Sequence, residues 1–293
     1  MSGGGPYGQP GYNPQYGNPY GANAPPPAGW TGQQQYQQPP PMPMHPNMMG
    51  GGANYSHADP EANDGYKNMQ FSDVTIRAAF IRKVFMLVTI MLLVVAVMTA
   101  IPYTNSDTMT FVRANMALYW CAYGTFFVVY LVLMCCESVR RSFPINLVMT
   151  GVFTLAVGYM TMMITAHHRV ETVLLALIIC TVCCGSIVVY ASTTKRDLTN
   201  MMGVMFILSM CLLVFGIVAA ISVAFFKIKF LYTIYALLAA ILFMFYLAID
   251  VQMIMGGRKY EISPEDHIFA AIQIFLDIVY IFWMLLSLFG SSK

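Results

Sequence analysis

The sequence contains few charged residues for its length. Lys, Arg, Asp and Glu together make up 10% of the 293 residues, compared with about 25% in soluble globular proteins. Hydrophobic residues make up 58% of the chain, and the mean hydropathy is +0.62. This composition excludes an ordinary soluble domain and indicates an integral membrane protein whose first partner is the lipid bilayer.

Several recognisable kinds of functional site are also missing. No cluster of Lys and Arg is large enough to suggest a nucleic acid partner, and no nucleophile–base pair or phosphate-binding loop indicates an enzyme. The seven cysteines lie within or at the ends of apolar runs, whereas a disulfide framework needs cysteines in an oxidising aqueous space. We therefore expect no disulfides, no cofactor and no permanently bound metal.

The first 66 residues are of low complexity and contain no Lys or Arg. They are rich in Gly, Pro, Tyr, Gln, Asn and Met, and we expect a disordered tail because such a segment buries too little apolar surface to fold. The stretch 38–41 (Gln-Pro-Pro-Pro) and its surroundings could bind an aromatic-lined groove of a cytosolic partner as a polyproline II helix. The stretch 13–16 has the Asn-Pro-x-Tyr form of a sorting signal, but a tail of this composition produces such a match easily by chance.

Residues 67–83 are predicted to form a basic juxtamembrane segment. Ser72 or Asp73 is a candidate N-cap for a helix that runs toward the membrane. The preceding N-terminal segment lacks the apolar core of a signal peptide, so the first span is expected to direct membrane insertion.

Seven apolar runs follow, and together they predict an all-α membrane domain over residues 84–290. They cover approximately 84–102, 115–136, 145–166, 172–192, 202–226, 230–252 and 267–289. Each is close to the roughly 20 residues that a helix needs to cross the hydrocarbon core. Small residues within or beside the spans are expected to allow close helix packing; they are Gly158, Gly185, Gly203 and Gly216.

The Lys and Arg residues between the spans predict the orientation. If the N-terminus is cytoplasmic, ten of these residues lie on the cytoplasmic side: Lys67, Arg77, Arg82, Lys83, Arg140, Arg141, Lys195, Arg196, Arg258 and Lys259. Five lie on the opposite side: Arg113, Arg169, Lys227, Lys229 and Lys293. The excess supports a cytoplasmic N-terminus. The seventh run either crosses completely or re-enters on the cytoplasmic side, and this count hardly distinguishes the two.

Two of the thirteen acidic residues lie inside apolar runs, Asp250 in the sixth and Asp277 in the seventh. A carboxylate at lipid depth is costly and normally faces the protein interior or water. Asp277 lies about ten residues into its run, or about 15 Å deep, and Asp250 is shallower. Gln273 and Tyr280 share the helical face of Asp277, and Tyr246 that of Asp250. The alternative is an ordinary ion pair, in which Arg258 or Arg140 neutralises Asp250.

Two carboxyl groups that share a site of low dielectric constant do not both ionise easily, so they titrate as one coupled unit. Such a pair either holds a proton between its members or separates, or it binds a cation when both members are charged. Hard oxygen ligands suit calcium. If the sixth and seventh helices face each other, Asp250 and Asp277 would therefore form a pH-sensitive cation site.

Short motifs around these acids resemble the C-terminal signature of the Bax-inhibitor/lifeguard family of transmembrane proteins. The matching stretches are 248–252 (Ala-Ile-Asp-Val-Gln), 255–257 (Met-Gly-Gly), 262–266 (Ile-Ser-Pro-Glu-Asp) and 275–279 (Phe-Leu-Asp-Ile-Val). The connector 140–146 (Arg-Arg-Ser-Phe-Pro-Ile-Asn) resembles that of the lifeguard branch, which includes the glutamate-receptor-associated proteins. The stretch 263–266 also has the pattern of a helix N-cap with Pro at the first helical position and Asp at the third.

The resemblance implies seven helices with the seventh in the centre, wrapped by the other six. It also implies a calcium leak across an internal membrane, gated by a di-aspartyl pH sensor that Asp250 and Asp277 match. Arg140 matches the arginine that latches the sixth-helix acid. Calcium is then the permeant ion, the expected membrane is Golgi or endoplasmic reticulum, with plasma membrane as an alternative, and the function includes calcium homeostasis and restraint of apoptosis.

Two other functions fit parts of the sequence. A membrane scaffold would regulate apoptosis or receptors through membrane-protein partners and through cytosolic partners of residues 1–66, without conducting ions. A proton-coupled transporter would also use paired intramembrane acids, but the sequence has neither the repeated halves nor the pair of broken helices that build a substrate site in such proteins.

Overall fold

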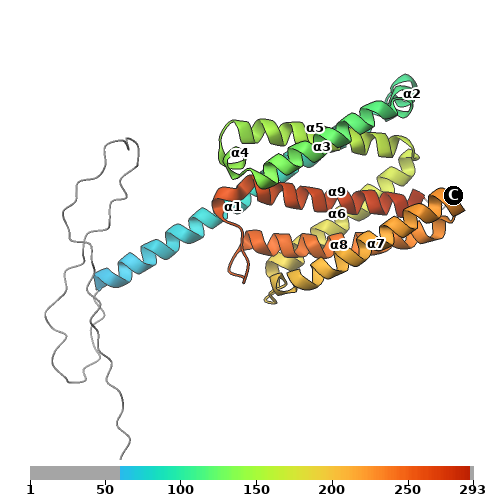
Figure 1. The fold of residues 1–293 in the computed structure, drawn as a ribbon. Coiled ribbons are helices and arrows are strands. Elements are labelled where there is room, and N and C mark those ends of the chain that lie inside the picture. The colour runs from blue at the N-terminus through green and yellow to red at the C-terminus, as the bar shows by residue number, and fades with distance from the viewer. Residues whose placement is uncertain (1–59, 291–293) are drawn as a thin grey trace, which may run out of the picture. The chain divides into compact units, whose positions relative to one another are not determined.

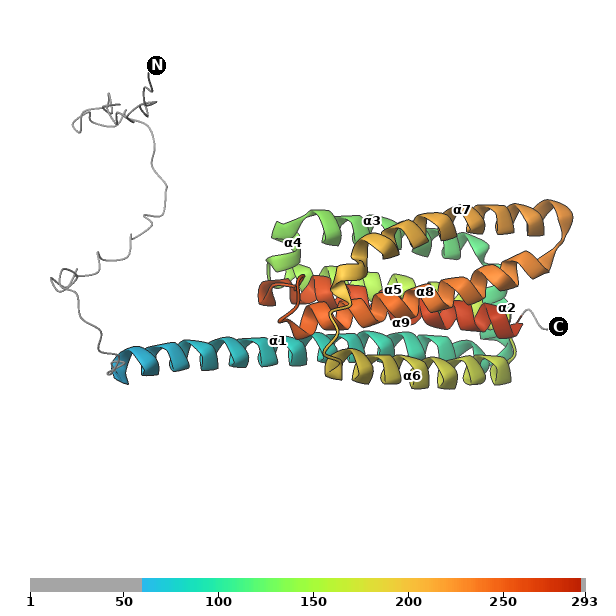
Figure 2. The ribbon, with the colours of Figure 1, turned by 90° about the horizontal axis from the view of Figure 1, so that it is seen from below.

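The structure of the protein, a computed structural model, describes residues 60–290, and for residues 60–72 it describes the backbone alone. All regular elements in this range are helices (Figures 1 and 2). The predicted partner motifs at 13–16 and 38–41 lie outside the described residues.

Seven of the helices are long and apolar enough to cross a membrane. They are α1 (Pro60–Ala100), α3 (Met116–Cys135), α5 (Ile145–Ala166), α6 (Val170–Thr193), α7 (Met202–Phe226), α8 (Lys229–Met255) and α9 (His267–Gly290). The shorter elements are α2 (Ser106–Ala114), α4 (Glu137–Arg141) and the 3-10 helices η1 (Ile101–Tyr103), η2 (Thr199–Met201) and η3 (Pro264–Asp266). The predicted all-α fold with seven spans is confirmed.

Helix α1 begins earlier than the composition predicts. It starts at Pro60, so residues 60–66 of the expected tail and the whole segment 67–83 continue without a break into the first span. Ser72 and Asp73 therefore lie inside the helix, and the prediction that either caps its start is wrong. Proline at the first position of α1 fits there because this position needs no backbone N–H donor.

Helix α9 is the centre of the bundle. In its most apolar window 67% of the residues are buried, compared with 11% in α7. It packs along α8, α1, α6 and α5, whereas α3 packs mainly on α5 and α7 mainly on α8. Figure 2 shows α3 and α7 on one side of the α8–α9 pair and α1 and α6 on the other. The central position of the seventh span is confirmed, although the outer helices do not wrap it evenly.

The seventh span crosses the whole bundle. At one end Asp266 binds the arginines of α4, and at the other end Gly290 lies against the ring of His168, in the connector between α5 and α6. A helix of 24 residues is about 36 Å long, enough to cross a bilayer core of about 30 Å. The length and position of α9 favour a complete crossing over a re-entrant seventh segment.

Two of the four glycines selected from the sequence make close helix contacts. A side chain on Gly158 would collide with Met98 of α1, and one on Gly216 would collide with the ring of Tyr235 on α8. Gly185 and Gly203 have open space where a Cβ would be, so the packing role predicted for these two is wrong.

Candidate functional site at the paired aspartates

The structure brings Asp250 of α8 and Asp277 of α9 together. The two helices run antiparallel, and the two carboxyl groups lie within hydrogen-bonding reach of each other. Both residues are buried, with 5% and 7% of their surfaces exposed. The sequence predicted that Asp277 lies deeper in the membrane than Asp250, but the two residues lie side by side. Asp277 is ten residues from the start of α9 and Asp250 is five residues from the end of α8, so α9 extends about 7 Å farther out than α8 at this end.

Within residues 73–290, no cationic side chain forms an ion pair with either acid. The ion pairs of this range involve other acids, and Oδ2 of Asp277 has no hydrogen-bond donor from these residues. A buried carboxylate without a donor is costly. A proton shared by the two acids, or a cation bound between them, would satisfy the unpaired oxygen. The alternative prediction, an ordinary ion pair of Asp250 with Arg258 or Arg140, is not met in this structure.

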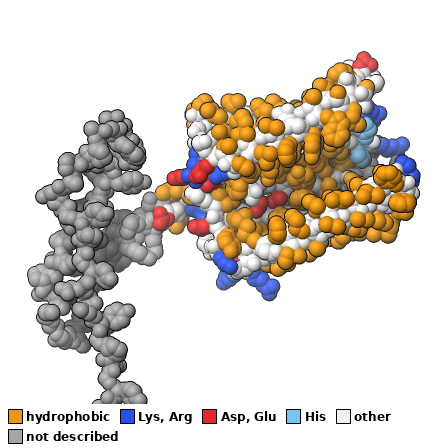
Figure 3. All heavy atoms as spheres, in the orientation of Figure 1, with side chains coloured by type: hydrophobic (Ala, Val, Ile, Leu, Met, Phe, Trp, Pro, Cys, Tyr) orange, Lys and Arg blue, Asp and Glu red, His pale blue; other side chains and the backbone are white. Residues whose placement is uncertain are grey.

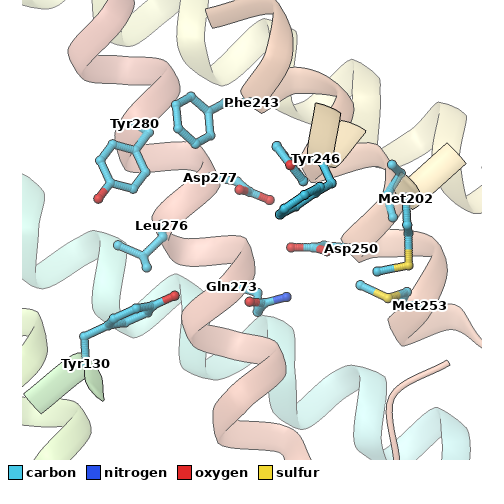
Figure 4. A pocket seen from close by; sticks show the side chains of 12 residues that line it. Tyr130, Met202, Phe243, Tyr246, Asp250, Met253, Gln273, Leu276, Asp277 and Tyr280 are labelled. Atoms are coloured by element: carbon cyan, nitrogen blue, oxygen red, sulfur yellow. The ribbon is translucent and has the colours of Figure 1, made fainter. Parts of the chain in front are cut away.

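The two acids lie in a cavity of about 370 Å³ (Figure 4). Its polar lining consists of Asp250, Asp277, Gln273, Tyr130, Tyr246 and Tyr280. Its apolar lining consists of Met202, Phe206, Phe243, Ile249, Met253 and Leu276. The three supporting residues selected from the sequence, Gln273, Tyr280 and Tyr246, thus all lie at the site.

Aromatic rings order one wall of the cavity. The rings of Phe243 and Tyr280 are stacked with their centroids 4.8 Å apart, which joins α8 to α9 just beyond the acids. Tyr280 also meets Trp283 edge to face, and the indole N–H of Trp283 donates to the Thr161 hydroxyl of α5 at 3.0 Å. Tyr246 donates to the carbonyl of Met205 on α7. These contacts fix the positions of the rings around the carboxyl pair.

Sequence reasoning did not find Tyr130, Met202 or Phe206. They come from α3 and α7, far from the acids along the chain, and their own segments show no polar or spacing signal that separates them from lipid-facing residues. Figure 3 shows acidic side chains in a hollow on this face of the molecule, with hydrophobic side chains around them. The hollow lies between α3 and α7 in the orientation of Figure 1.

Arg140 does not line this cavity. Its Nε donates to Oδ1 of Asp266 at 3.1 Å, its Nη1 donates to the carbonyl of Met134, and its guanidinium lies 5.2 Å from the ring centroid of Phe269. Asp266 is eleven residues before Asp277, or about 16 Å along α9. The expected latch between Arg140 and Asp250 is therefore not formed in this structure.

The predicted capping box at the start of α9 is also not formed. Ser263 precedes η3 and Pro264 occupies its first position, but the Ser263 side chain makes no cap hydrogen bond. Asp266 binds Arg140 and Arg141 with its carboxylate instead of reaching back to the N-cap. The hydrogen bond with Asp266 raises the pKa of Arg141, and Arg141 also forms ion pairs with Glu137 and Glu265.

The loop between α8 and α9 is held by α1 as well. Arg77 donates to the carbonyl of Ile262 at 2.6 Å and forms an ion pair with Glu261 at 2.6 Å. Its guanidinium packs over Gly256, which has φ +76° and leaves no room for a side chain. Glu261 also accepts from the backbone N–H of Gly257. The contacts of Arg77 thus join the first helix to the loop that connects the two acid-bearing helices.

A third set of contacts ties α8 to the connector between α6 and α7. Gln252, two residues after Asp250, is fully buried; its Oε1 accepts from the N–H of Leu198 at 2.7 Å, and its Nε2 donates to the carbonyl of Arg196 at 2.8 Å. Arg258 donates to the carbonyls of Thr194 and Lys195. The hairpin that carries the aspartates is therefore anchored by α1, by α4 and by the α6–α7 connector.

Comparison with known proteins agrees with the motifs. A family model described as "Inhibitor of apoptosis-promoting Bax1" matches residues 77–293. The chain is 38% identical to human Protein lifeguard 3 over 287 residues, which are 97% of this chain and 88% of that protein. It is 38% identical to mouse Protein lifeguard 3 over 98% of this chain and 89% of that protein. Mouse Protein lifeguard 4 is 27% identical over 74% of this chain and 86% of that protein.

Proposed function

The chain belongs to the Bax-inhibitor/lifeguard family of membrane proteins, and on that basis we propose that it is a pH-sensitive calcium leak channel of an internal membrane. The observation that carries the proposal is the pair Asp250 and Asp277, which face each other inside the seven-helix bundle and have no cationic partner within residues 73–290. The family model's description links the family to inhibition of apoptosis, and control of calcium release would be the physical basis of that link.

The proposed gate is the charge state of the carboxyl pair. With one shared proton, the two acids hold α8 and α9 together through a hydrogen bond. With both acids ionised, the pair either separates by repulsion or coordinates calcium through its oxygens. Protonation acts on the pore because it favours one of two helix arrangements over the other. Gln273, Tyr246 and Tyr280 complete the polar lining and are proposed to support the permeant ion.

Arg140 is proposed to act as the latch in the alternative arrangement. A latch to Asp250 requires the guanidinium to leave Asp266, so the two contacts exclude each other. In this structure the Asp266 contact is made. The proposed switch therefore joins the acid pair at the middle of the bundle to the ion pairs at the start of α9.

The test is calcium entry into liposomes that contain the purified full-length chain and a trapped calcium dye, recorded from pH 5 to pH 8. Asp250→Asn and Asp277→Asn are expected to change both the flux and its pH dependence. Asp107→Asn is the matched control, because it removes a carboxylate from an exposed position. The proposal is refuted if folded wild-type protein gives no flux, or if both site variants keep the wild-type pH profile.

We further propose that the N-terminus is cytoplasmic and that the membrane is that of the Golgi or endoplasmic reticulum. The ten basic residues on one side against five on the other support this orientation. A protease added to sealed microsomes is expected to cleave within residues 1–59. Protection of this segment in intact microsomes would reverse the proposed orientation.

The second candidate function is a scaffold that restrains apoptosis through membrane-protein partners and cytosolic partners of residues 1–66 without conducting ions. The description of the family model, an inhibitor of apoptosis-promoting Bax1, favours it. Because α1 begins at Pro60, deletion of residues 1–59 removes most of the tail and leaves the described helices complete. Loss of cell protection with unchanged calcium flux would support the scaffold, whereas protection that follows flux in the Asp variants would contradict it.

A further inference from the structure

The cavity around the aspartates opens on the outer face of the bundle, which is the face that lipid would cover. Helix α3 supplies Tyr130 and helix α7 supplies Met202 and Phe206 to its rim, and α3 and α7 pack on α5 and α8 rather than closing on each other. Phe206 is 61% exposed. Figure 3 shows the resulting hollow, with acidic side chains visible between hydrophobic ones.

The lining combines negative charge with aromatic walls. Five of its side chains are aromatic, namely Tyr130, Phe206, Phe243, Tyr246 and Tyr280. The faces of such rings attract organic cations, which is how aromatic cages recognise amines and quaternary ammonium groups. Two carboxyl groups next to these rings supply the counter-charge, so the chemistry of the cavity suits an organic cation.

One buried polar atom of the cavity lacks a partner among the described residues. It is Oδ2 of Asp277, a residue with only 7% of its surface exposed. Figure 4 shows both carboxyl groups and the amide of Gln273 directed into the same space. A primary ammonium group has three donors, and it could satisfy the acids and the amide oxygen together.

The size of the cavity argues for more than an inorganic ion. At about 370 Å³ it lies in the range of small-molecule sites, which are mostly apolar with a few polar groups. The apolar residues at its rim are poor ligands for a hydrated cation and good contacts for an alkyl chain. The polar end of an occupant would therefore lie at the aspartates and its apolar end at the opening to lipid.

We propose that this cavity binds a single-chain amphiphilic amine that enters from the bilayer between α3 and α7. The ammonium group donates to the carboxyl pair of Asp250 and Asp277 from the cavity side, within the aromatic rings, and the chain leaves past Tyr130 and Phe206 into the lipid. The occupant would engage both acids, so, if the proposed calcium leak is correct, it would regulate the same site. Binding itself requires the carboxyl pair and the opening, but no ion flux.

The experiment is competitive photolabelling of the full-length protein in nanodiscs of phosphatidylcholine. The probe is dodecylamine with a photoreactive diazirine in the chain, and the matched control probe is the corresponding dodecanol. Labelled residues are located by peptide mass spectrometry. The amine is expected to label α3 near Tyr130 and α7 near Phe206. Excess dodecylamine should reduce this labelling about tenfold or more, while excess dodecanol should not.

Two sets of variants separate this site from general partition into lipid. The Asp250→Asn, Asp277→Asn double variant should lose labelling about tenfold or more, as expected when charged hydrogen-bond partners are removed, and Asp107→Asn should not. Phe206→Ala keeps both acids and should weaken labelling severalfold. Its control is Phe225→Ala, a change at an exposed residue next to the C-terminal end of α7.

The inference is overturned if the amine labels Phe225 as strongly as Phe206, if the alcohol competes as well as the amine, or if Phe206→Ala and a folded double variant both keep full labelling. Failure of this inference is distinguishable from failure of the proposed function. Specific amine labelling by a protein without calcium flux would refute only the leak. Calcium flux without specific labelling would refute only the amine site.

Discussion

Gln252→Leu should release the connector between α6 and α7 while leaving the spans in place. Leucine is close to glutamine in volume, so the main loss is two short hydrogen bonds, to the N–H of Leu198 and the carbonyl of Arg196. Each partly buried backbone group left without a partner costs about 1–3 kcal/mol. Because the connector lies at the surface and water can replace part of the loss, we expect a total of about 2–4 kcal/mol for local opening.

The assay is hydrogen exchange of the purified protein, followed at the amide of Leu198. A change of 2–4 kcal/mol corresponds to exchange that is about 30–1,000 times faster when exchange follows local opening. Thr193→Val is the matched control, since the Thr193 hydroxyl is exposed and bonds only within its own helix. If Leu198 exchanges at the wild-type rate in folded Gln252→Leu, Gln252 does not anchor the connector and the reasoning is wrong.

Three further changes test other contacts. Gly256→Ala should destabilise the α8–α9 loop by about 1–3 kcal/mol, because φ +76° suits glycine and the added methyl displaces Arg77; faster exchange in residues 256–262 would show this. Hydrogen bonds from the Thr199 hydroxyl and the Lys259 backbone hold the pKa of Asp197 below its usual range. The ionised carboxylate therefore stabilises the connector fully above about pH 4, and this stabilisation is lost as the pH falls through the folded-state pKa. Hydrogen exchange of the connector measured against pH should show this loss in wild type but not in Asp197→Asn. Trp283→Phe removes one hydrogen bond worth about 1 kcal/mol and should lower the thermal unfolding temperature by about 2–4 °C, and an unchanged temperature would contradict that assignment.

The spans were predictable because lipid imposes length and composition on each of them. Every apolar run recognised in the sequence contains or overlaps one long helix of the bundle. The start of α1 was not predictable from composition. Residues 60–66 are polar enough to resemble the preceding tail, and yet no proline after Pro60 interrupts the helix. Helix length outside the membrane depends on local propensity, and the hydrophobic pattern does not report it.

The two aspartates could be selected because a charge in an apolar run is conspicuous, and their neighbours followed from helical periodicity. The opening between α3 and α7 could not be predicted, because it depends on which outer helix packs on which inner one. The partner of Arg140 was also out of reach. Asp266 and Asp250 are both acids on the α8–α9 hairpin, and only the three-dimensional arrangement shows that Asp266 is the one within reach.

Helix α1 also has a mechanical consequence. Its 41 residues give a rod about 61 Å long, roughly twice the thickness of the hydrocarbon core. No proline interrupts it after Pro60, so a load applied near its start tilts the rod as a whole instead of bending it. Arg77 joins this rod to Glu261 and Ile262 of the α8–α9 loop. A force that tilts α1 would therefore also pull on the loop and on the two helices that carry the aspartates.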